Sequence, residues 1–96
     1  MNKLHCPATD KLFKAILKLE TIEECYNFFE DICTIKELMD MSQRLSVAEK
    51  LSAGKSYQEI SKETGASTAT ISRVNKCLNY GSGGYENALK KLETEE

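Results

Sequence analysis

The sequence predicts an all-α protein of six helices, and three observations lead to this prediction. The only proline is Pro7, so no later residue lacks the backbone N–H that a helix interior requires. A serine or threonine followed three residues later by glutamate, the capping-box pattern, opens three of the segments with helical periodicity. No segment alternates β-branched and polar residues as a half-buried strand does. We therefore expect helices and no sheet.

The first two predicted helices have broad apolar stripes. One begins at Pro7–Thr9, and the other follows the capping box of Thr21 and Glu24. Their apolar residues recur at helical spacing, as Leu12, Phe13, Ile16 and Leu17 in the first and Ile22, Cys25, Phe28, Phe29 and Ile32 in the second.

The box of Thr34 and Glu37 opens a longer third helix, and Gly54 fits the left-handed position just past its end. Three shorter helices follow. Their predicted limits are the box of Ser56 and Glu59 with a closing Gly65, then Ser67 or Thr68 to about Asn79, then Tyr85 to about Glu93. In the last helix we expect the inward residues to be Ala88, Leu89 and Leu92.

The length of 96 residues indicates one domain, 1–96. We divide it into dimerisation helices at 8–53, a helix-turn-helix at 56–79 and a C-terminal helix at 84–94. The first three helices have wider apolar faces than so small a monomer can cover, which favours a homodimer over a compact monomer.

Composition argues against several classes of protein. The single His5 and the absence of paired carboxylates or a nucleophilic triad argue against an enzyme. The four cysteines, which are Cys6, Cys25, Cys33 and Cys77, lack the close spacing of metal ligands, so we expect reduced, mostly buried thiols and no metal site. No apolar run is long enough for a membrane span or a signal peptide, and we expect a cytoplasmic protein.

Residues 57–78, "YQEISKETGASTATISRVNKCL", match a helix-turn-helix in several independent ways. Such a pair needs a small residue at the helix crossing and a residue tolerant of positive φ in the turn, and Ser61 and Gly65 provide them. It also needs apolar contacts between the helices, for which the sequence offers Ile60, Ala66, Ile71 and Val74.

The second helix of this pair begins with small and hydroxyl side chains, which allow close approach to base edges and phosphates in a major groove. Residues 55–79 carry a net charge of +2 in a chain of net charge −2, a weak indication of a nucleic-acid partner. The candidate DNA contacts are Gln58, Lys62, Ser67, Thr68, Ala69, Thr70, Ser72, Arg73 and Lys76. Lys55 is a further candidate for a contact with the DNA backbone.

The segments "GASTATISR" and "RLSVAEKLSAGKSYQEI" resemble the Trp repressor family, and more closely its Trp-repressor-like branch from Gram-positive bacteria. The resemblance runs from about Thr34 to Leu78, and the order of six helices extends it over nearly the whole chain. It implies a six-helix Trp-repressor-like fold and an intertwined homodimer whose two reading heads bind successive major grooves.

The resemblance also implies a corepressor pocket between the long helix and the recognition helix. Thr34, Arg44 and Arg73 match family positions around that pocket. Val74 stands where the tryptophan-binding members have glycine and would occupy space that the indole ring uses. No ligand is certain from the sequence; a small-molecule corepressor that resembles an amino acid is possible, and tryptophan is a doubtful candidate. Gln58 replaces an arginine that reads a guanine in the family, so we expect a different operator.

The function predicted from the sequence is sequence-specific DNA binding by a transcriptional regulator, a repressor that reads a palindromic operator. The alternative is a helical protein-interaction module without sequence-specific DNA binding, which the acidic remainder of the chain favours. Salt dependence separates the two, because phosphate neutralisation makes affinity fall steeply with added salt.

Overall fold

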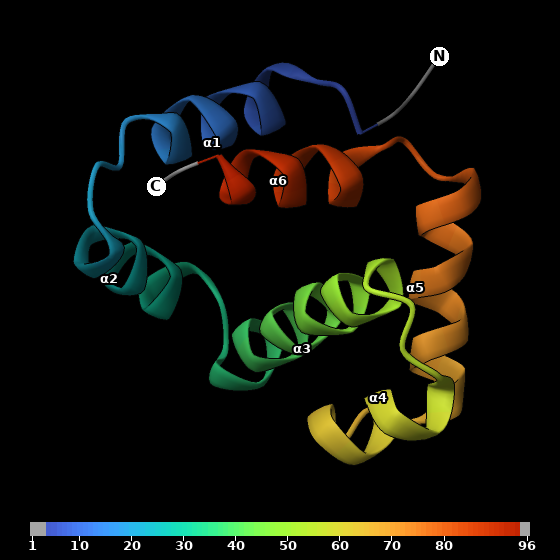
Figure 1. The fold of residues 1–96 in the computed structure, drawn as a ribbon. Helices are drawn as coiled ribbons and strands as arrows, with labels where there is room; N and C mark the ends of the chain where they lie inside the picture. The colour runs from blue at the N-terminus through green and yellow to red at the C-terminus, as the bar shows by residue number, and fades with distance from the viewer. Residues whose placement is uncertain (1–3, 95–96) are drawn as a thin grey trace. The chain divides into compact units, whose positions relative to one another are not determined.

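The computed structural model describes residues 4–94, and these residues form six helices and no strand, as predicted (Figure 1). The helices are α1 (Pro7–Leu17), α2 (Ile22–Ile32), α3 (Ile35–Ser52), α4 (Tyr57–Thr64), α5 (Thr68–Tyr80) and α6 (Gly84–Glu93). Close backbone contacts divide the chain into two compact units, one ending at Leu38 and the other beginning at Met39, so the boundary lies within α3.

The first unit contains α1, α2 and the start of α3. Pro7 occupies the first turn of α1, where its missing N–H costs nothing. The capping box predicted at α2 is present, because Glu24 N–H donates to Thr21 Oγ1 at 3.0 Å and Thr21 N–H donates to Glu24 Oε1 at 3.3 Å. The rings of Phe28 and Phe29 meet edge to face with centroids 5.4 Å apart.

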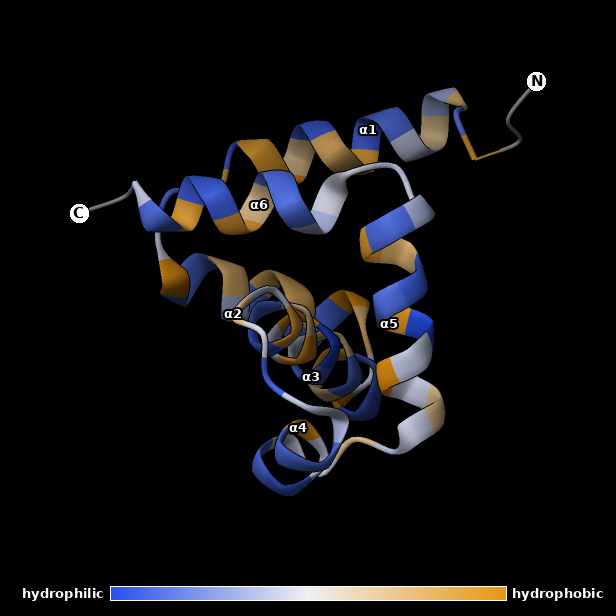
Figure 2. Ribbon diagram, turned by 45° about the vertical axis from the view of Figure 1, so that its right-hand side comes forward, coloured by the Kyte–Doolittle hydropathy of each residue, from blue (hydrophilic) through white to orange (hydrophobic). Residues whose placement is uncertain are grey.

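Apolar side chains of the first unit are largely exposed. Within residues 4–38, no side chain is buried, and hydrophobic segments recur along α1 and α2 (Figure 2). Leu17 is 81% exposed and Ile22 is 77% exposed. The other large apolar residues of this unit that lie open are Leu4, Phe13, Tyr26, Ile32 and Ile35.

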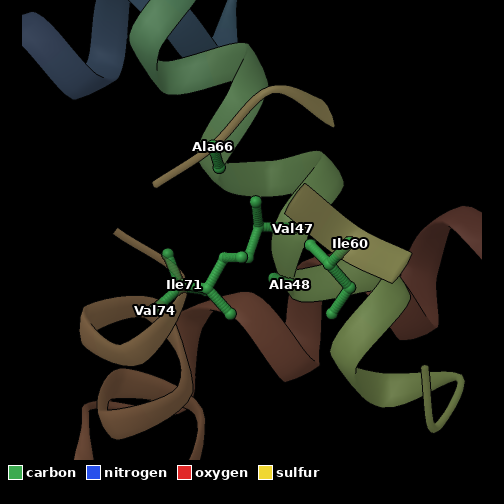
Figure 3. Close-up of a cluster of buried hydrophobic side chains, with 6 residues drawn as sticks. All are labelled: Val47, Ala48, Ile60, Ala66, Ile71 and Val74. Atoms are coloured by element: carbon green, nitrogen blue, oxygen red, sulfur yellow. The ribbon is translucent and has the colours of Figure 1, made fainter. Parts of the chain in front are cut away.

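The buried core lies in the second unit. Six side chains from α3, the α4–α5 turn and the facing sides of α4 and α5 form it, and Figure 3 shows them converging. They are Val47, Ala48, Ile60, Ala66, Ile71 and Val74. The four inter-helix contacts predicted from the sequence are all among them. Burying this apolar surface is the main term that fixes α4 and α5 against α3.

The inward face of α6 differs from the prediction. Tyr85 and Leu89, four residues apart on one face, pack against the core, whereas Ala88 and Leu92 are exposed. Leu92 lies nearly one turn beyond Leu89 and helps to line an open pocket instead of the core. Leu89 alone of the three expected residues is therefore directed as predicted.

The expectation of mostly buried cysteines is wrong for this chain. Cys25 and Cys77 are exposed, while Cys6 and Cys33 are half-buried, and all four are free thiols. Three of them belong to the first unit, where no described side chain is buried. Cys77 lies on the outward side of α5, three residues after buried Val74.

Among residues 4–94, no helix combines the length and the apolar character that crossing a bilayer requires.

Candidate nucleic-acid interface

Helix α4 begins at the capping box predicted from the sequence. Ser56 N–H donates to Glu59 Oε1 at 2.9 Å, and Glu59 N–H donates to Ser56 Oγ at 3.2 Å. The hydrogen bonds from the backbone and side chain of Ser56 hold the pKa of the Glu59 carboxyl below its ordinary value. The box therefore favours the ionised form of Glu59 and fixes where α4 starts.

The turn between α4 and α5 consists of three residues, 65–67. Gly65 has φ +76°, the left-handed conformation that a side chain disfavours, and its N–H donates to the Ser61 carbonyl at 2.8 Å. Figure 1 shows α5 leaving the end of α4 in a new direction after this turn.

Two hydroxyl side chains satisfy the backbone C=O and N–H of Ala66 in the turn. Ser61 Oγ donates to the Ala66 carbonyl at 2.8 Å. Thr64 Oγ1 donates to the Ile60 carbonyl at 2.7 Å and accepts from Ala66 N–H at 3.1 Å. The sequence reading assigned Ser61 only as a small residue at the helix crossing, and it missed Thr64. These bonds tie the conformation of the turn to the last turn of α4.

A third polar contact joins the turn to α3. Gln43 Nε2 donates to the Thr64 carbonyl at 3.2 Å, and both residues are partly buried. The sequence reading did not single out Gln43. The two residues lie 21 positions apart, so no local motif signals the contact.

Ser67 is the N-cap of α5, as one of the two predicted alternatives has it. Its Oγ accepts a hydrogen bond from Thr70 N–H at 3.1 Å and lies 3.1 Å from Thr70 Oγ1. Ser67 and Thr70 are therefore engaged with each other. The backbone N–H groups of Thr68 and Ala69, in the first turn, have no partner within the helix and are available to an anion.

Helix α5 has an apolar inner side and a polar outer side. Ile71 and Val74 are buried, and Leu78 packs against the core one turn later. The outer side carries Thr68, Ala69, Ser72, Arg73 and Lys76, all of which are exposed. Figure 2 shows the first turn of α5 in pale colours, intermediate between hydrophobic and hydrophilic. Small and hydroxyl side chains thus form an exposed surface at the start of α5, and the opposite side of this helix is buried in the core.

The cationic side chains near α4 and α5 fall into two classes. Lys62, Arg73 and Lys76 are exposed, and within residues 4–94 they form no ion pair or side-chain hydrogen bond. Lys55 is different, because its Nζ lies 3.0 Å from Glu63 Oε2, and this hydrogen bond raises the pKa of the lysine. The free charges that remain for a phosphate are therefore those of the first class. Gln58 is also exposed and unpaired in this part of the chain.

The four predicted pocket residues have distinct environments. Thr34 belongs to the first unit and caps α3, where its Oγ1 accepts from Glu37 N–H at 3.0 Å and its N–H donates to Glu37 Oε1 at 2.8 Å. In the second unit Arg44 is half-buried and Arg73 is exposed. The Val74 side chain is only 1% exposed and forms part of the core.

Two pockets in the second unit lie elsewhere. One, of about 320 Å³, lies between α3 and α6 and is lined by Glu49, Ser52, Ala53, Leu89, Leu92 and Glu93. Another, of about 330 Å³, is lined by Leu51, Ser52, Asn75, Leu78, Asn79 and Glu86. Neither includes a predicted pocket residue. No group of three or more metal-binding side chains gathers within residues 4–94.

Comparison with known proteins agrees with this arrangement. The sequence profile described as Trp repressor protein matches residues 8–93. The chain belongs to the Trp repressor protein family. This is a family of DNA-binding regulators and not a family of enzymes. At the level of the family, the function is therefore that of a DNA-binding regulator.

The chain is similar to proteins from three bacteria. The uncharacterized protein YerC of Bacillus subtilis (strain 168) is 52% identical over 96 residues, which are all of this chain and 92% of that protein. The crystal structure of a TrpR-like protein from Eubacterium eligens has a TM-score of 0.94 and 50% identity, covering 98% of this chain and 97% of that one. A candidate Trp repressor from Staphylococcus aureus has a TM-score of 0.92 and 49% identity, with coverage of 95% and 91%. The predicted Trp-repressor-like fold is thereby confirmed.

Proposed function

We propose that the protein is a sequence-specific transcriptional regulator that binds double-stranded DNA with α4 and α5 acting as a helix-turn-helix. The observation that carries the proposal is the outer side of α5, where exposed small and hydroxyl residues are held outward by a buried inner side. The first turn of α5 then enters the major groove, where such side chains allow close approach of the backbone.

Within this proposal the candidate DNA contacts divide by their engagement in the free protein. Thr68, Ala69 and Ser72 have side chains open to solvent and contact base edges. Ser67 and Thr70 hold the helix cap, and the neighbouring backbone N–H groups of Thr68 and Ala69 bind a phosphate. The unpaired side chains outside this set contact phosphates or nearby bases; they are Gln58, Lys62, Arg73 and Lys76.

A homodimer is the second part of the proposal. The apolar residues left open on α1, α2 and the start of α3 supply a contact surface, and two copies would present two reading heads to a two-fold symmetric operator. Occupying such a site in the cytoplasm represses transcription by occlusion. Analytical ultracentrifugation at micromolar concentration tests this part, and a purely monomeric protein would contradict it.

A small-molecule corepressor is the third part. Arg44 and Arg73 are unpaired cations within residues 4–94, and a ligand with a carboxylate, such as an amino acid, suits them. Thr34 belongs to the expected set through the family resemblance. The buried isopropyl group of Val74 disfavours tryptophan, because a flat indole needs space at that position.

The experiment that tests the regulator is selection of bound sequences from random duplex DNA by the purified protein, with and without a mixture of amino acids. Recovery of a two-fold symmetric sequence supports the proposal, and recovery that requires the mixture supports the corepressor. Recovery of bound sequences that share no motif contradicts the proposed regulator.

The alternative function is a helical protein-interaction module, which the exposed acidic residues of α2 favour. DNA binding whose affinity falls steeply with added salt would argue against this alternative. For six phosphate contacts the affinity should fall by roughly a factor of 10³ as salt rises from 50 to 200 mM.

A further inference from the structure

Besides the partly exposed ion pair of Lys50 and Glu63, two kinds of contact fix the α4–α5 pair to α3. The first is the buried core, whose apolar contacts are non-directional and tolerate small rotations. The second is the hydrogen bond from Gln43 Nε2 to the Thr64 carbonyl, 3.2 Å long. It is a directional contact at the turn, close to where α5 begins.

The carbonyl that Gln43 contacts is otherwise available for reorientation. Gly65 follows it in a left-handed conformation, and a peptide next to glycine rotates more easily than others. Both backbone polar groups of Ala66 in the turn are satisfied from within the α4–α5 pair, by Ser61 and Thr64. Gln43 therefore supplies the side-chain hydrogen bond that ties the turn to α3.

We propose that Gln43 is a positioning residue for DNA recognition, which holds the turn so that α5 keeps the orientation that a major groove requires. The inference rests on the proposed DNA-binding function. Without the bond, the α4–α5 pair samples further orientations, and the affinity for a specific site falls by the fraction of time spent in the competent one. Nonspecific attraction to phosphates depends on charge and is unaffected.

Two variants of this residue separate geometry from charge. Gln43→Met keeps the length of the side chain and removes the donor. Gln43→Glu keeps the shape but directs a carboxylate at the Thr64 carbonyl, which is repulsive. The matched controls are Asn87→Leu and Asn87→Asp, which make the same changes of polarity and charge at an exposed amide on α6.

The measurement is the affinity of each protein for the selected operator and for a scrambled duplex at one salt concentration. Gln43→Met should lose roughly 2- to 10-fold on the operator, the equivalent of one net hydrogen bond, and should retain its affinity for the scrambled duplex. Gln43→Glu should lose more on the operator than Asn87→Asp does. Amide hydrogen exchange at Gly65 and Ala66 should be faster in both Gln43 variants than in wild type.

Thermal unfolding shows whether the variants fold, and Gln43→Ser replaces Gln43→Met if the latter does not melt cooperatively. Wild-type operator affinity together with wild-type amide exchange in the Gln43 variants would overturn the inference and leave the proposed function standing. Equal losses on both duplexes would also overturn it. If the wild-type protein itself does not prefer any sequence, the proposed function fails and the inference fails with it.

Discussion

Lys55 Nζ lies 3.0 Å from Glu63 Oε2, so the connection between α3 and α4 is tied to the last turn of α4. Glu63 Oε1 also lies 3.8 Å from Lys50 Nζ, and one carboxylate thus faces two lysines. Because these side chains are partly exposed, the pairs add little to stability. Their effect is on charge, because Glu63 neutralises Lys55, which lies in the connection just before α4.

The first prediction concerns the salt dependence of DNA binding. Lys62→Ala removes an unpaired cation and should reduce the slope of log affinity against log salt by about 0.9, the value for one phosphate contact. Lys55→Ala removes a lysine already paired with Glu63 and should change the slope less. Titrations at four or five salt concentrations measure both, and equal slopes for the two variants would contradict the assignment.

The second prediction concerns pH. The folded protein holds the pKa of Glu59 below its ordinary value of 4.5, because Ser56 donates hydrogen bonds to the ionised form. The resulting stability is complete above that value and is lost as pH falls through the lower, folded pKa. Glu59→Gln keeps a capping side chain but does not titrate. The melting temperature of wild type should exceed that of Glu59→Gln most at neutral pH, and the difference should shrink below pH 4.5. A constant difference from pH 7 to 3 would argue against the ionised box.

The third prediction concerns the turn. Gly65→Ala forces a side chain into a left-handed conformation and should destabilise the protein by about 1 kcal/mol. An added Cβ would meet no atom within 4 Å, so the cost is conformational and not steric. Gly84→Ala is the control, because its site is equally open and its φ is not positive. That change should be neutral or slightly stabilising in chemical denaturation, and similar losses in both variants would refute the explanation.

The fourth prediction separates stability from recognition on α5. Ser67→Ala removes the N-cap acceptor of Thr70 N–H and should cost about 1 kcal/mol of unfolding free energy. Thr68→Ala removes an exposed hydroxyl that has no partner in the described part of the chain, and should leave stability within about 0.5 kcal/mol. Thr68→Ala should nevertheless lower operator affinity more than it lowers nonspecific affinity. Unchanged operator affinity would remove Thr68 from the interface.

The fifth prediction concerns the proposed ligand. Val74→Gly empties a buried site and places glycine in a helix, so it should cost about 3 kcal/mol or more of stability. If Val74 is what excludes an indole, this variant should bind L-tryptophan in calorimetry while wild type does not. Val74→Ala is the control for stability, with a smaller cavity. If a folded Val74→Gly protein gives no heat of binding with L-tryptophan, residues other than Val74 exclude the indole.

Local chemistry explains which parts of the fold could be predicted from the sequence. The boxes at Thr21, Thr34 and Ser56 span only four residues each, and all three form as expected. The contacts of Ile60 and Ile71 follow from the spacing within one motif, and both residues are buried. Predictions that depended on a few neighbouring residues were therefore reliable here.

Predictions that depended on distant packing were weaker. The side of α6 that meets the core is decided by α3 and α5, so the expectation for Leu92 failed. Gln43 reaches a carbonyl 21 residues away and carries no sequence signal. For the candidate interface, the sequence indicated the outward residues of α5 but not that Lys55 is neutralised by Glu63. That pairing depends on the path of the connection between α3 and α4.

Because the buried residues are unevenly distributed, the two units differ in their ability to fold alone. Residues 4–38 enclose no side chain, so the entropy lost in ordering their helices must be offset by contacts from beyond that segment. A fragment ending near residue 38 would be unstructured in dilute solution and quickly digested. The remainder, from Met39 onward, retains every buried side chain among residues 4–94 and would outlast it.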